Sequence, residues 1–347
     1  MDDRGVPSLW RVVQRIVWLL GAAIVGSLFA WPTVGLQAFW NVLIPVAPAL
    51  LVFAPGVWRN ICPLATTALL ADRMELSKGS RLSIPAQGRL FLAGVLLLAM
   101  IVPLRRLFLN ASGPATGITL LVAAAAALLL GWKFGRKSPW CAGLCPVYPV
   151  ERLYGIGPAV TPANARCSEC RRCSLPCPDS TPAFDPNRAA RTPARRAAGT
   201  LLVGGFVGFV FGWFQVPDFT AGDGWRHLAS IYGLPLAGGG ATLALYLFVR
   251  CLCSERLLAR LFAAAAVSCY YWFRLPMLFG FGEHPGFGVL LDLSGVLPPW
   301  APLVSRAGTT ALFLAWFLAG AGRNRPWSVR PPFAFARGAA SPTPPQP

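Results

Sequence analysis

The sequence predicts an all-α polytopic membrane protein with about eight transmembrane helices. Of its 347 residues, 55% are hydrophobic and only 13% are charged, whereas about a quarter of the residues in a soluble domain are charged. The charged residues are also unevenly spread, and long apolar stretches separate the segments that carry them. These stretches are long enough to cross a lipid bilayer as helices, which identifies them as the spans.

The predicted spans follow one another along most of the chain. They cover residues 13–31, 36–57, 90–109, 115–132, 198–217, 229–249, 257–281 and 301–321. Pro103 and Arg105 shorten the third span, and Arg274 interrupts the seventh. We expect Arg274 and Arg306, in the outer thirds of their spans, to snorkel to the lipid headgroups. The aromatic residues near them predict an interfacial belt, and they are Tyr270, Tyr271, Trp272 and Trp300. Glycines at 204–205 and 238–240 permit close helix contacts.

The basic residues predict the orientation of these spans. With both termini inside, 26 of the 31 Lys and Arg residues fall on the inner side, as the positive-inside rule requires. We therefore predict a bacterial inner membrane protein with cytoplasmic N- and C-termini. The net charge of +18 then reflects topology and contact with anionic lipid. No basic stripe interleaved with aromatic residues indicates nucleic-acid binding.

A run of four cysteines lies between the fourth and fifth spans. Cys167, Cys170, Cys173 and Cys177 form a C-x2-C-x2-C-x3-C pattern that ends on Pro178, the spacing with which bacterial ferredoxins hold [4Fe–4S] clusters. Structural zinc sites more often pair two separated C-x2-4-C motifs, so zinc is the competing interpretation. The predicted fold is thus an all-α membrane protein with a small ferredoxin-like iron–sulfur insertion on the cytoplasmic side.

Three further cysteines lie near the inner ends of spans. Cys62 precedes Pro63, and Cys141 and Cys145 precede Pro146 in a C-x3-C-P box. In two-cluster ferredoxins the cysteine before the proline ligates the other cluster, and this chain has one full run only. A second cluster built from Cys62, Cys141, Cys145 and a further cysteine is therefore an open alternative. A disulfide framework is not expected in the reducing cytoplasm.

The remaining cysteines carry weaker predictions. Cys251 and Cys253 follow the sixth span and are open between a ligand role and a structural one, and Cys269 within the seventh span is expected to be a small buried side chain. The predicted regions are a four-helix membrane region at 1–135, the iron–sulfur segment at 136–197, a second four-helix region at 198–322 and a disordered Pro-rich tail at 323–347.

The cysteine motifs resemble those of membrane-bound 4Fe–4S polyferredoxins, the proteins associated with periplasmic nitrate reductase and with nitrous oxide reductase maturation. The resemblance covers about 133–180 and includes the stretches at 135–140 and 150–155. Trp58 occupies the position where a complete C-x3-C-P motif would have its first cysteine. Cys62 and Pro63 therefore form only the second half of such a motif. The resemblance implies electron transfer between the quinone pool, or a cytoplasmic donor, and a partner enzyme.

Other cofactors and catalytic groups have little support in the sequence. The two histidines, His227 and His284, are predicted near the outer face, where they leave haem or quinone contact open, but ordinary interfacial positions are favoured. No nucleophile-and-base pair is present, so we predict no catalytic residue. Arg166, Arg171 and Arg172 place positive charge beside the cysteine run, which would raise a cluster's potential and attract an acidic donor such as a flavodoxin or ferredoxin.

The sequence therefore predicts a membrane-bound iron–sulfur electron-transfer protein, a component of an oxidoreductase system that works with a respiratory reductase or oxidase. Two alternatives remain open. One is a maturation factor for a respiratory metalloenzyme, and the other is a non-redox membrane protein with a structural zinc site. Deleting the gene distinguishes an electron carrier from a maturation factor. Loss of an electron carrier would leave the partner enzyme assembled but unreduced.

Overall fold

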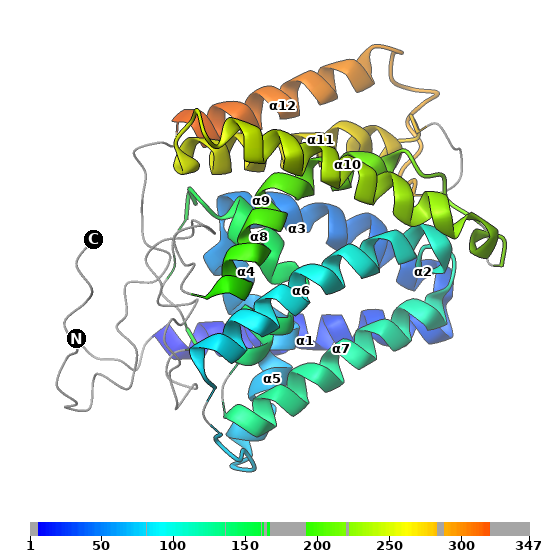
Figure 1. The fold of residues 1–347 in the computed structure, drawn as a ribbon. Helices are drawn as coiled ribbons and strands as arrows, with labels where there is room; N and C mark the ends of the chain where they lie inside the picture. Colours follow the sequence, from blue (N-terminus) through cyan, green and yellow to red (C-terminus); the bar gives the residue numbers. More distant parts are fainter. Residues whose placement is uncertain are drawn as a thin grey trace.

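The computed structural model describes residues 6–80, 82–135, 137–160, 162, 165–166, 192–219, 222–282 and 288–319. Within these residues all regular structure is helical (Figure 1). Eight helical segments are long and apolar enough to cross a membrane, which confirms the predicted number of spans. They are α1 (Val6–Ala30), α2 to α3 (Pro32–Phe53), α6 with η2 (Ile84–Leu109), α7 (Gly113–Phe134), α9 (Pro193–Phe214), η4 with α10 (Gly224–Val249), α11 (Glu255–Leu278) and α12 (Ala301–Ala319).

Hydroxyl caps fix where four of these helices begin. Ser83, Ser112, Thr192 and Ser254 each accept the backbone N–H of the residue three positions later, before α6, α7, α9 and α11 respectively. Such caps satisfy one of the amides that a helix start leaves without an intrahelical partner. Helix α7 ends at Gly135, whose φ of 61° is the left-handed conformation that glycine adopts without strain. The observed starts of these helices, which lie two to six residues before the predicted ones, are therefore set by local chemistry.

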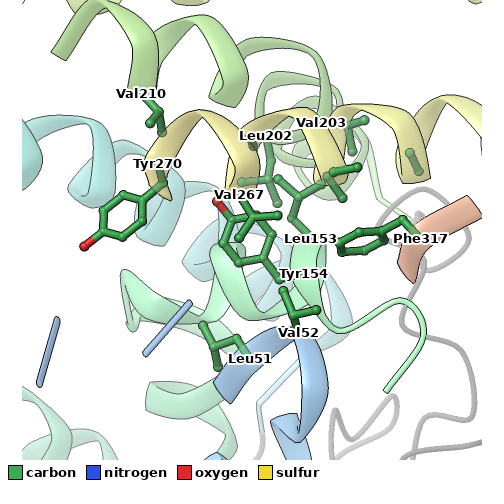
Figure 2. Packing of buried hydrophobic residues seen from close by; sticks show 14 of the residues in the cluster. Leu51, Val52, Leu153, Tyr154, Leu202, Val203, Val210, Val267, Tyr270 and Phe317 are labelled. Carbon is green, nitrogen blue, oxygen red and sulfur yellow. The ribbon is translucent and has the colours of Figure 1, made fainter. Parts of the chain in front are cut away.

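The short helix α8 (Val147–Tyr154) lies inside the bundle, although it is far too short to span a membrane. Figure 2 shows its Leu153 and Tyr154 among side chains from α3, α9 and α11, and both residues are fully buried. Because α8 directly follows Cys145 and Pro146, its burial fixes that cysteine to the core of the protein.

Glycines bring α9 and α10 into direct backbone contact, as the sequence predicts. A Cβ atom on Gly208 would collide with the backbone carbonyl of Gly238, and one on Gly212 would collide with that of Leu234. Gly208 also donates its N–H to the Thr242 hydroxyl at 3.2 Å. Small residues at four-residue intervals are the usual device for close helix packing in membranes.

The snorkelling prediction is wrong for Arg274. Its side chain is 2% exposed and points into the protein, where Nη2 donates to the Trp40 carbonyl at 2.9 Å and to Asn41 Oδ1 at 2.5 Å. Hydrogen-bond acceptors on the second span pair with Nη2 of this guanidinium, so the side chain does not extend to the lipid headgroups. Arg306, by contrast, is half-buried and donates to the Trp272 carbonyl at 3.1 Å.

The prediction of an interfacial belt is also wrong for Tyr270 and Tyr271, which are buried in the core. The Tyr271 hydroxyl lies between two backbone groups of α3 (Ile44–Phe53): it donates to the Pro45 carbonyl at 2.7 Å and accepts the Ala49 N–H at 3.0 Å. These two groups would otherwise pair directly as a helical i to i−4 bond. A hydroxyl from α11 therefore completes the backbone of the second span, as a polar group in a membrane protein requires.

Candidate metal centre

The structure describes six of the ten cysteines, and all six are thiols rather than disulfides. Cys167, Cys170, Cys173 and Cys177 lie outside the described residues. Cys269 packs in α11 against the main core, in agreement with the structural role predicted for it. Of the two histidines, His227 is exposed with its ring stacked on Phe219, which fits an interfacial position, and His284 lies outside the described residues.

Cys62 and Cys145 occupy two turns of nearly the same geometry. Cys62 lies between α4 (Pro55–Ile61) and α5 (Pro63–Arg73), and Cys145 lies between η3 (Trp140–Leu144) and α8. Their φ and ψ angles are −52° and 121° for Cys62 and −60° and 121° for Cys145. A residue before proline is driven out of the helical conformation, so each Cys-Pro pair breaks one helix and starts the next. Each sulfur therefore lies at the beginning of a helix.

The electrostatic surroundings of the two sulfurs are similar. Burial, followed by the Coulombic effect of Cys62, raises the pKa of the Cys145 thiol to about 12, against the opposing effect of the backbone amides of Val147 and Tyr148. Burial likewise raises the pKa of Cys62, against the amides of Ala65 and Leu64 and the charge of Arg166. Amides and a cation directed at sulfur favour bound thiolates, the form in which cysteine ligates metals.

Arg166 ties the start of the cysteine run to the Cys62 turn. Its buried guanidinium donates through Nε to the Arg59 carbonyl at 3.3 Å and through Nη2 to three oxygens. These three acceptors are the carbonyls of Asn60 and Cys62 and the Thr66 hydroxyl, at 3.0, 3.1 and 2.9 Å. The preceding residue, Ala165, donates its N–H to Asn60 Oδ1 at 3.1 Å. Cys167, the first cysteine of the run, follows Arg166 directly in the sequence.

A buried ion pair joins the two Cys-Pro turns through their neighbouring helices. Arg59 on α4 pairs with Glu151 on α8, and the Arg59 guanidinium lies 5.3 Å from the centre of the Tyr148 ring. Arg152 is also buried here, and burial is the main cause that lowers its pKa. The Ala159 N–H donates to the Phe53 carbonyl at 2.8 Å and so holds the chain after α8 against the end of α3.

The described cysteines supply part of a ligand set. Cys62 and Cys145 come together, but within the residues that the structure describes, no three Cys, His, Asp or Glu side chains converge as metal ligands. Cys141 lies in η3 and packs against the small cluster that includes Ala68 and Trp140. Cys251 and Cys253 lie in the loop after α10, of which Cys251 is exposed.

Sequence reasoning assigned Arg166 only a general electrostatic influence and missed its hydrogen bonds to the Cys62 turn. Its position directly before Cys167 was the one available signal. Comparison with protein-family models, with curated proteins and with solved structures gives no match.

Proposed function

We propose that this protein is a membrane-bound iron–sulfur electron-transfer protein with at least one [4Fe–4S] cluster. Cys167, Cys170 and Cys173 hold three irons, and the fourth ligand is Cys177 or a Cys-Pro cysteine of the membrane bundle. The contact of Arg166 with the Cys62 turn carries this proposal, because Arg166 directly precedes the first cysteine of the ferredoxin-type run and donates to the Cys62 carbonyl.

The cluster supplies one-electron chemistry, and the residues of the chain position it and set its environment. Arg166 and Arg59 place buried positive charge next to the Cys62 turn. Positive charge stabilises the reduced cluster, which carries one more negative charge, and so raises its potential. A cluster held at the end of the membrane bundle is accessible to a soluble donor on that side and close to quinone in the bilayer. We place this side in the cytoplasm of a bacterium.

Anaerobic purification of the full chain tests the proposal. We expect a broad visible absorbance that bleaches with dithionite, an electron paramagnetic resonance signal from the reduced protein and about four irons per chain for one cluster. About eight irons would indicate that Cys62, Cys141 and Cys145 contribute to a second cluster. Stoichiometric zinc without visible absorbance would overturn the proposal in favour of a structural zinc site.

Replacing Arg166 with glutamine should weaken cluster binding and lower the midpoint potential of the cluster that remains. The variant loses charge-assisted hydrogen bonds to the Cys62 turn, each contributing about 2 kcal/mol, together with one positive charge near the sulfurs. Iron content and a redox titration of the purified protein measure the two effects.

The matched control is Arg250→Gln, which removes an exposed arginine whose Nε lies 3.6 Å from a Glu255 carboxylate oxygen. Its iron content and potential should equal those of the wild type. If Arg166→Gln also behaves as the wild type, Arg166 does not position the cluster.

A further inference from the structure

A cavity of about 160 Å³ lies at the end of the bundle where α6 is followed by η2. On α6, Gly94 packs against the Cys145 carbonyl and Leu104 directly precedes Arg105 of the cavity lining. The ten residue steps between them correspond to about 15 Å at about 1.5 Å per residue. The cavity is lined by residues that lie far apart in the sequence, among them Trp40, Arg105, Arg106, Trp213, Asp218 and Arg274. Its polar character is unusual for the end of a membrane bundle.

Three arginines of this lining are buried. Arg105, Arg106 and Arg274 are 6%, 3% and 2% exposed. The Arg105 guanidinium carbon lies 4.1 Å from the centre of the Trp40 ring and 4.9 Å from that of Trp213, so two indoles hold it in place. The Arg105 Nε also donates to Asn110 Oδ1 at 3.2 Å. These contacts orient the side chain before any ligand arrives.

The described lining residues offer fewer negatively charged acceptors than they carry positive charges. Asp218 is the one carboxylate among the lining residues, and it is shared between Arg106 and the Asn110 amide, which donates at 2.7 Å. The buried Nε atoms of Arg106 and Arg274 have no acceptor within the described part of the chain.

Buried cations are costly unless an anion pairs with them. Water could fill the volume, at about 30 Å³ for each molecule, but water does not balance the two excess positive charges of the lining residues that the structure describes. The arginines come from two different spans, Arg105 and Arg106 from η2 (Arg105–Leu109) at the end of the third span and Arg274 from α11. Donors that approach from several sides suit a tetrahedral ligand better than a planar carboxylate, which a single arginine grips from one side.

We infer that this cavity binds a doubly charged oxyanion of the phosphate class. The inference is independent of the iron–sulfur proposal, because it concerns the other end of the bundle and needs none of the cysteines. The ligand has two sources with the same chemistry. One is free inorganic phosphate, and the other is the phosphate of a lipid headgroup at the membrane boundary.

Calorimetry of the full-length protein in detergent, titrated with inorganic phosphate at constant ionic strength against chloride, tests the free ion. For the lipid, native mass spectrometry counts phosphatidylglycerol retained by the delipidated protein. We expect saturable binding of one ligand in at least one of the two experiments. Absence of saturable binding in both overturns the inference.

Two variants with opposite expected effects show whether the binding belongs to this cavity. Arg105→Gln should weaken binding about tenfold or more, since a charge-assisted contact is lost. Asp218→Asn removes the competing carboxylate and should tighten binding, an effect that misfolding cannot imitate. Arg306→Gln, at the same end of the bundle but outside the cavity lining, is the control and should bind as the wild type does. Equal binding by all four proteins would place the ligand elsewhere.

Discussion

Replacing Cys170 with alanine should abolish both the visible absorbance and the paramagnetic signal of the proposed cluster. Cys170 is the central member of the three cysteines at two-residue spacing, and a cluster that loses one thiolate from this arrangement loses an iron site that no neighbouring residue replaces. Absorbance, paramagnetic resonance and iron content of the anaerobically purified variant measure the loss.

Cys269→Ala is the matched control, because the same atoms are removed from a cysteine that packs against the core within α11. Its absorbance and iron content should equal those of the wild type, at a small cost in stability. If Cys170→Ala retained the full signal, the ligands would lie elsewhere. Cys145→Ala then locates the fourth ligand, since the signal disappears if Cys145 completes the cluster and persists if Cys177 does.

Replacing Gly208 with leucine should prevent α9 and α10 from packing and cost at least about 3 kcal/mol of folding free energy. A Cβ atom alone would overlap the Gly238 carbonyl and lie 2.8 Å from the Thr242 methyl group. The helices would have to separate, which also breaks the hydrogen bond from the Gly208 N–H to Thr242. Thermal melting of the purified protein and its yield in the membrane measure the effect.

The control for this variant lies on the neighbouring helix. Gly240 on α10 is exposed, and a Cβ atom there would meet nothing within 4 Å, so Gly240→Leu adds the same bulk on a surface that faces away from α9. Its melting temperature should be close to that of the wild type or higher. Equal loss in both variants would mean that added side-chain bulk on either helix, rather than the contact of α9 with α10, explains the result.

Most of the membrane architecture could be predicted from the sequence because apolar length depends on local composition. The eight spans follow from it, and the glycines of α9 and α10 indicated the close contact. The direction of a side chain around its helix was not predictable in the same way. Arg274 appeared suited to snorkelling because its partners, Trp40 and Asn41, lie more than 230 positions away in the sequence.

The candidate site was predictable only in its ligand types. The Cys-Pro pairs indicated Cys62 and Cys145, but their proximity depends on α8, whose Glu151 and Arg152 give it the composition of a surface segment. Its burial becomes possible because Arg59, on a helix far away in the sequence, pairs with Glu151. The sequence pattern of α8 alone does not show that a distant arginine will pair with its glutamate.

The hydroxyl of Tyr271 between Pro45 and Ala49 has a consequence for the order of biogenesis. The second span leaves the ribosome long before α11 does, and until α11 arrives the Tyr271 hydroxyl cannot lie between the Pro45 carbonyl and the Ala49 N–H. The segment that leads to Cys62 therefore reaches its final form only after the seventh span is inserted. Under the proposed function, loading of the cluster would then follow insertion of the seventh span.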